Sequence, residues 1–144
     1  MQHDNIALAR KWFEQVWAPG GETVAREMLH PQALGHMESG EVKGCDQFLA
    51  VREQLLQAMP DLSIRVDDII GEGDKVVVRW SVTATHAGDG MGLTASQQPV
   101  SFRGITWLHF SNGQLVEGWD AWNEGQLMNK LSRPGASPVA AAAA

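Results

Sequence analysis

The chain of 144 residues is long enough to bury one sizeable core, and its 44% hydrophobic and 19% charged residues are an ordinary globular composition. The formal net charge is −6 and the basic residues form no stripe, which argues against nucleic acid and anionic membrane surfaces as partners. The sequence contains neither a signal-peptide pattern nor an apolar stretch of membrane-spanning length. The single cysteine, Cys45, has no internal disulfide partner, so we expect a cytoplasmic protein.

Helical signals dominate the first half of the chain. Asp4 is a suitable N-cap for the first helix, and proline or glycine residues end each helical stretch. Apolar residues three or four positions apart give each helix one hydrophobic face. The expected elements are helices from about residue 4 to 17, over 23–29 and over 44–59, with a short strand over 33–37.

Alternating apolar and polar residues dominate the second half. The alternation is cleanest from Lys75 to His86, where every second residue from Val76 to Ala84 is apolar. The expected elements are strands over residues 62–70, 75–86 and 100–110, a further strand after the turn at 112–113, and a helix over 124–131. Residues 132–144 end in polyalanine and have little to bury, so we expect a disordered tail after a single domain over residues 1–131.

Helices followed by a long antiparallel meander predict an α+β fold, in which helices pack on one face of a curved antiparallel sheet. The concave face of such a sheet encloses a pocket, and a ligand is expected there.

The hairpin over residues 105–123 contains the strongest functional signal. Asn112 and Gly113 tolerate the positive φ angles of a tight two-residue turn. Near the end of the second arm, Asp120 lies between the indoles of Trp119 and Trp122. A carboxylate in an apolar setting has a raised pKa unless a partner compensates it, which is a common way to build a general base. The alternative is a carboxylate that caps the following helix or lies in solvent at the strand end.

With a two-residue turn, one face of the hairpin is expected to carry Trp107, His109, Asp120 and Trp122, and the other to carry Trp119. A one-residue bulge would exchange part of this assignment. His86 continues the apolar face of its strand and is expected to line the pocket, or else to be a hydrogen-bonded residue at a strand end. The predicted catalytic residues are Asp120, His109 and His86, and the predicted substrate-binding residues are His36, Trp80, Trp107, Trp119 and Trp122. No metal-ligand spacing is found, so no metal site is expected.

Four segments resemble the SnoaL-like polyketide cyclase family, within the nuclear transport factor two-like superfamily with its cystatin-like fold. They are residues 59–62 (MPDL), 73–80 (GDKVVVRW), 85–88 (THAG) and 112–120 (NGQLVEGWD). The resemblance implies a cone-shaped sheet and an intramolecular aldol condensation without metal or cofactor, and it assigns the acid/base role to Asp120. The chain departs from the family at residues 93–99 (LTASQQP), where a Pro-Thr-Gly segment is usual.

The expected function is a cofactor-independent cyclase or isomerase that acts on a polyketide-like or other polycyclic carbonyl compound. The alternatives are a hydrolase or dehydratase that uses the same cavity, and a non-catalytic carrier of a small hydrophobic or aromatic ligand. An enzyme is expected to place Asp120 and at least one histidine inside the cavity, whereas a carrier would keep its polar groups outside. The fold often dimerises through the outer face of its sheet, so a homodimer is expected, and the face of Arg79, Ser81 and Thr83 is available.

Overall fold

The computed structural model describes residues 4–90 and 92–132. Its helices are α1 (Asn5–Gln15), α2 (Gly21–Met28), α3 (Gly44–Ala58) and α4 (Glu124–Leu131). Its strands are β1 (Leu29–Met37), β2 (Gly40–Lys43), β3 (Ser63–Glu72), β4 (Lys75–Thr85), β5 (Pro99–Ser111) and β6 (Gln114–Trp122). The tail predicted over residues 132–144 lies outside the described residues, apart from Ser132. None of the described helices is long and apolar enough to cross a membrane.

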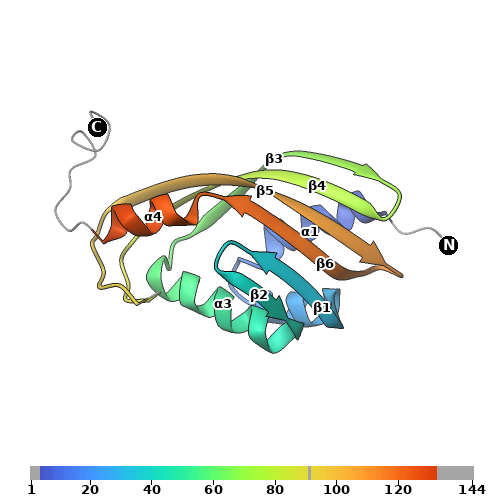
Figure 1. Cartoon of the computed structure of the whole chain (residues 1–144), viewed down its shortest axis with the longest axis horizontal. Helices are drawn as coiled ribbons and strands as arrows, with labels where there is room; N and C mark the ends of the chain where they lie inside the picture. Colours follow the sequence, from blue (N-terminus) through green and yellow to red (C-terminus); the bar gives the residue numbers. More distant parts are fainter. Residues whose placement is uncertain (1–3, 91, 133–144) are drawn as a thin grey trace.

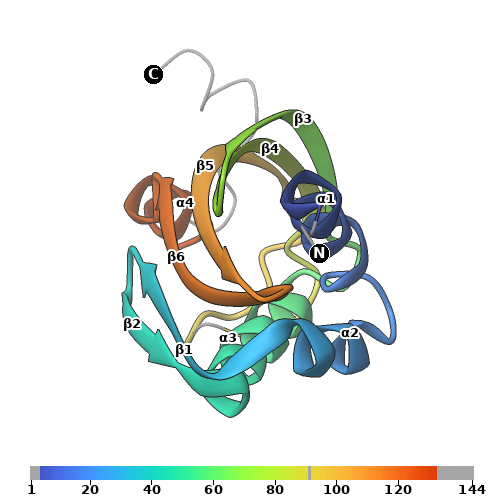
Figure 2. The same ribbon diagram turned by 90° about the vertical axis from the view of Figure 1, so that its right-hand side faces the viewer.

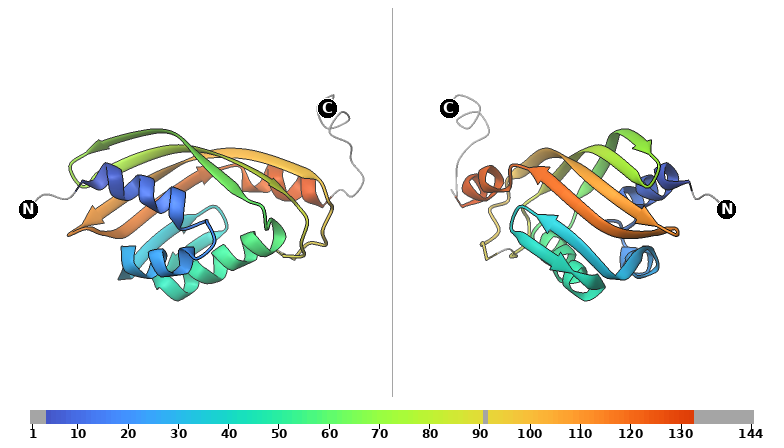
Figure 3. Two further views of the ribbon diagram at one scale, coloured as in Figure 1. Left: turned by 180° about the vertical axis from the view of Figure 1, so that it is seen from behind. Right: turned by 45° about the vertical axis from the view of Figure 1, so that its right-hand side comes forward.

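One six-stranded sheet, in the order β2-β1-β6-β5-β4-β3, forms the body of the protein (Figure 1). The sheet curls into an open arc without closing, and helices α1 to α3 lie along its open side (Figures 2 and 3). The predicted α+β fold class and curved sheet are confirmed, with one difference: β1 pairs parallel to β6, while the other strand pairs are antiparallel. The difference arises because β1 reaches the far edge of the meander, a non-local pairing that local patterns do not encode.

Local signals account for most of the element ends. The side chain of Asp4 accepts a hydrogen bond from the Ala7 amide at 3.1 Å and caps α1 as expected. The turn between β5 and β6 has φ angles of 50° at Asn112 and 79° at Gly113, as a two-residue hairpin turn requires. Strand β2 was not predicted, and β1 begins earlier than predicted, directly after α2.

Arg52 ties the N-terminal helices to α3. Its side chain is only 4% exposed and donates to the carbonyl oxygens of Val16 at 2.6 Å and Ala18 at 2.9 Å, and to Glu22 at 2.9 Å. The first bond satisfies the carbonyl of Val16, the C-cap of α1, and the second adds to the bond that the Ala18 carbonyl in the following turn accepts from the Gly21 amide. The helices are thereby fixed relative to each other on the open side of the sheet.

Candidate functional site

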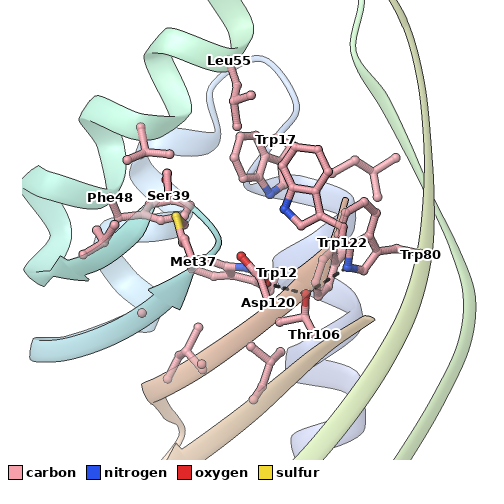
Figure 4. Close-up of a pocket in the computed structure, with 18 of the residues that line it drawn as sticks. Trp12, Trp17, Met37, Ser39, Phe48, Leu55, Trp80, Thr106, Asp120 and Trp122 are labelled. Atoms are coloured by element: carbon pink, nitrogen blue, oxygen red, sulfur yellow. Dashed lines mark hydrogen bonds between the residues drawn. The ribbon is translucent and has the colours of Figure 1, made fainter. Parts of the chain in front are cut away.

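A cavity of about 380 Å³ lies between the concave face of the sheet and helices α1 and α3. This volume is within the usual range for small-molecule pockets, which is roughly 300–1,000 Å³. Aromatic side chains from both halves of the chain form much of its wall (Figure 4). They are Trp12, Phe13 and Trp17 near the N-terminus, Phe48 from α3, Trp80 from β4, Phe102 from β5 and Trp122 from β6.

Few polar residues line this cavity, and none of the lining residues within the described part of the chain is Lys, Arg or His. The polar lining residues are Ser39, Gln54, Thr106, Glu117, Asp120 and Glu124. Carboxylates without a facing cation disfavour anionic ligands. The cavity therefore suits a compound that is not anionic and that has flat apolar surfaces.

Asp120 lies on the cavity wall, where protein surrounds its carboxyl group. Its Oδ1 accepts a hydrogen bond of 2.6 Å from the Thr106 hydroxyl, and Thr106 in turn accepts one of 2.9 Å from the Trp80 indole nitrogen. The other carboxyl oxygen points away from Thr106 into the pocket (Figure 4). Burial raises the pKa of Asp120 above the ordinary value of 3.8, the bond from Thr106 opposes this effect, and the nearby charge of Glu38 adds to it.

Asp120 has no part in capping α4, the structural alternative considered above. Asn123 is the N-cap, and its side chain accepts a hydrogen bond from the Gln126 amide at 2.8 Å. Among the described residues, the hydrogen bond to the Asp120 carboxyl comes from Thr106 on β5. The second carboxyl oxygen is therefore available to a ligand.

A bulge in β6 changes the hairpin faces from those predicted. Ser111 pairs with Gln114 as expected, but the register shifts between His109 and Phe110, so that Trp107 pairs with Trp119 and Thr106 with Asp120. One extra residue in one strand of a hairpin moves each later side chain of that strand to the opposite face of the sheet relative to its partner strand. The prediction that Trp107 and His109 share the face of Asp120 and Trp122 is wrong.

The predicted tryptophans consequently divide between the two sides of the sheet. Trp80 and Trp122 line the cavity, where their rings lie 6.3 Å apart in an edge-to-face arrangement. Trp107 and Trp119 lie outside it on the convex face, 47% and 41% exposed. A substrate in the cavity would contact the first pair and not the second.

None of the three predicted histidines lines the cavity. His109 binds Asp74 at 2.8 Å near the β3–β4 turn, and His36 binds Glu117 at 2.7 Å and stacks on Trp119. His86 is fully buried beyond the cavity, where its Nδ1 lies 2.8 Å from the Ser96 hydroxyl. The structure thus places Asp120 in the cavity without a histidine.

Several cavity residues were not singled out from the sequence. Thr106 became visible only through the true hairpin register. Trp12 lies on α1 and Trp17 lies in the turn after it, and from the sequence both indicate no more than core packing. Glu124 begins α4, and burial, together with the charge of Glu38, raises its pKa. Within the described residues, no three His, Cys, Asp or Glu side chains are grouped so that they could hold a metal ion.

The raised pKa of Asp120 predicts how stability depends on pH. The ionised form is disfavoured in the folded state, so wild-type unfolding free energy should fall, relative to Asp120→Asn, as the pH rises from 3.8 through the folded-state pKa. Above that pH, the variant should be as stable as the wild type or more stable. Urea unfolding of both proteins between pH 4 and 8 measures this, with Asp46→Asn, at an exposed carboxylate, as control. A free energy of unfolding that rises with pH in the wild type relative to Asp120→Asn would contradict this prediction.

Comparison with known proteins gives a consistent family. The family model for SnoaL-like polyketide cyclases matches residues 7–131. A candidate SnoaL-like polyketide cyclase from Jannaschia sp. CCS1 is 27% identical, with a TM-score of 0.84 over 90% of this chain and 92% of that one. AclR from Streptomyces galilaeus, a candidate hydroxylase, is 32% identical, with a TM-score of 0.75 over 87% of this chain and 92% of that one. No curated protein matches the chain significantly.

Proposed function

Because the chain belongs to the SnoaL-like polyketide cyclase family, we propose that it is an enzyme in which Asp120 transfers protons on a polyketide-like carbonyl compound. The observation that carries the proposal is the carboxyl group of Asp120, held by Thr106 on the wall of a largely apolar cavity. A carboxyl group whose pKa is raised toward neutrality is a better general base than an ordinary aspartate.

The proposed reaction is an intramolecular aldol condensation or a related isomerisation. Asp120 removes a proton from the carbon next to a carbonyl, and the carbon that loses it attacks a second carbonyl of the same molecule. One carbon–carbon bond forms, one C–H bond breaks, and the carbonyl oxygen becomes a hydroxyl on receiving the proton that Asp120 carries. The condensation is redox-neutral. Glu124, the second cavity carboxyl with a raised pKa, is proposed to stabilise the developing oxyanion by a hydrogen bond and to keep its own proton, while the proton that completes the hydroxyl comes from Asp120.

A deuterium-exchange assay tests this proposal before the natural substrate is known. Aromatic ketones with an acidic α-hydrogen are incubated with the protein in D₂O, and mass spectrometry follows deuterium uptake at the α-carbon. The proposal predicts exchange by the wild type with at least one such ketone, and a strongly reduced rate in Asp120→Asn. Equal exchange by the two proteins, or none by the wild type with any ketone that binds, would overturn it and favour a carrier.

Hydroxylation of the same class of compound is a second candidate, favoured by the 32% identity to AclR. Removal of the proton from carbon by Asp120 is a shared first step, after which the carbanion would react with molecular oxygen and an external two-electron reductant. Incorporation of ¹⁸O from ¹⁸O₂ into the product distinguishes hydroxylation from cyclisation.

The convex face of the sheet is the proposed interface of a homodimer. A row of cross-strand neighbours crosses this face from β3 to β6, formed by Ile70, Val77, Trp107 and Trp119. Ile70 is 65% exposed, and Ile105 beside the row is also exposed. An exposed apolar patch of this kind is typical of a protein–protein contact, and two copies of one patch are complementary under twofold symmetry. The row lies next to the strip of Arg79, Ser81 and Thr83 that the sequence suggested.

Trp107→Glu is expected to weaken the dimer by about a hundredfold or more, because the twofold axis would bring two carboxylates into an apolar contact. Sedimentation velocity over a concentration series measures the dissociation constant. Gln57→Glu, at an exposed position of α3 on the open side of the sheet, is the control and should leave the dimer intact. A wild type that remains monomeric at about 100 μM would contradict this proposal.

A further inference from the structure

Trp80, Thr106 and Asp120 form a continuous hydrogen-bond chain from β4 through β5 to β6. The Trp80 Nε1 donates to the Thr106 Oγ1 at 2.9 Å, and the Thr106 Oγ1 donates to the Asp120 Oδ1 at 2.6 Å. Trp80 is 6% exposed and Thr106 4% exposed, so water does not compete for these bonds. The chain starts at a residue whose ring forms part of the cavity wall and ends at the proposed acid/base.

The direction of these bonds is fixed by the chemistry of the groups. An indole N–H can only donate, so Thr106 must accept from Trp80. A threonine hydroxyl has a single proton, and it is therefore available to Asp120. While the Thr106 hydroxyl donates to it, the Asp120 Oδ1 is the acceptor of that bond and is not free to carry the proton of a neutral carboxyl. A proton gained by Asp120 must then reside on Oδ2, the oxygen that points into the pocket (Figure 4).

We infer that Trp80 and Thr106 are positioning residues that confine proton transfer by Asp120 to its cavity-facing oxygen. This inference rests on the proposed function, since it concerns the same carboxyl group. It adds a role for two residues that do not exchange protons with the substrate. Without these hydrogen bonds, the carboxyl group could rotate and present either oxygen in either protonation state. Fewer encounters between substrate and Asp120 would then lead to proton transfer.

Trp80 is held in the orientation that this chain needs. Its ring stacks with Phe13 at 6.4 Å and meets Phe102 and Trp122 edge-on at 6.1 and 6.3 Å. Gly104 lies between Trp80 and Trp122 in the sheet. A Cβ at this glycine would lie 2.6 Å from Cζ2 of Trp80 and 2.7 Å from Cβ of Trp122. Only a residue without a side chain lets both indoles lie side by side above it.

The hydrogen bonds from Trp80 through Thr106 also affect the pKa of Asp120. The bond from Thr106 lowers the pKa of Asp120 against the effect of burial. Thr106→Val keeps the shape of the side chain but removes the hydroxyl, so the pKa of Asp120 should rise further. Thr106→Ser keeps the hydroxyl and should leave it nearly unchanged. Trp80→Phe leaves Thr106 free to turn away, so it should change the pKa in the same direction as Thr106→Val but less.

The test is a ¹³C NMR titration of the ligand-free protein with labelled aspartate carboxyl carbons, with Asp120→Asn used to assign the signal. The expected order of midpoints is wild type and Thr106→Ser lowest, then Trp80→Phe, then Thr106→Val. In the double variant Trp80→Phe/Thr106→Val, the Trp80 substitution should cause no further shift, because Trp80 acts through Thr106. Equal midpoints in all the single variants would overturn the inference, and so would an undiminished Trp80 effect in the double variant.

Kinetics with an identified substrate provide a separate readout. Thr106→Val should lower kcat by about tenfold to a hundredfold with little change in KM, and should move the acid limb of the pH profile to higher pH. Thr106→Ser keeps the hydroxyl and should show the kcat and the pH profile of the wild type. The titration needs no substrate, so the hydrogen-bond chain can fail while Asp120 remains catalytic. Conversely, Asp120→Asn can prove fully active while the titration still shows the predicted order, in which case only the proposed function fails.

Discussion

Replacing Asp120 by asparagine is expected to lower kcat by about a hundredfold to ten-thousandfold, the range usual for loss of a general acid/base. The amide has nearly the same shape as the carboxyl group, and its oxygen can still accept the hydrogen bond from Thr106. What is lost is the ability to carry a proton. Since the ligand is expected to bind mainly through the aromatic walls, KM and the dissociation constant should change little.

Steady-state kinetics of the wild type and Asp120→Asn with the same substrate measure this effect. Asp46→Asn removes a carboxylate whose side chain is 90% exposed, and serves as a control with unchanged kcat. If Asp120→Asn converts a true substrate at the wild-type rate, Asp120 is not the acid/base and the proposed mechanism is wrong.

Truncating Trp122 is expected to weaken ligand binding by about tenfold to a hundredfold, through loss of a large flat contact surface. Trp122 lines the cavity and stacks on Phe102 with ring centroids 4.7 Å apart. Trp107→Ala is a matched control, because it removes the same side chain from the neighbouring strand but on the convex face. Calorimetric titration with one ligand should show a loss for Trp122→Ala and no change for Trp107→Ala.

Thermal unfolding of both tryptophan variants is needed beside the binding data, because truncating a packed aromatic side chain costs about 3–5 kcal/mol when it is fully buried. The binding comparison is made at a temperature where both variants are folded. Equal losses of affinity in the two variants would show that the ligand does not occupy the concave cavity.

The sequence predicted those parts of the fold that depend on local chemistry. Asp4, the Asn112-Gly113 turn and the alternation along β4 each act over a few residues, and each is found as expected. Strand β2 has only four residues, too few to show a period, and the parallel partner of β1 lies some eighty positions away in the chain. Pairings of that kind depend on the assembled sheet.

The site was predicted in part for the same reason. Asp120 drew attention by its apolar neighbours, and it does line the cavity. The identity of its partner depended on the hairpin register, which a single extra residue near Val116 alters, so Thr106 was missed and Trp107 was placed on the wrong face. His109 was misplaced by the same shift. His86 follows the alternation inward as predicted, but the strand carries it past the cavity into contact with Ser96.

The most direct test of the central claim is a structure of the protein with a bound substrate or unreactive substrate analogue. The account predicts that the ligand lies in the concave cavity against Trp80 and Trp122, with its acidic carbon about 3–3.5 Å from the Asp120 Oδ2. The Thr106 hydroxyl should remain on Oδ1. A ligand bound elsewhere, or one in the cavity with its reactive carbon out of reach of Asp120, would contradict the account.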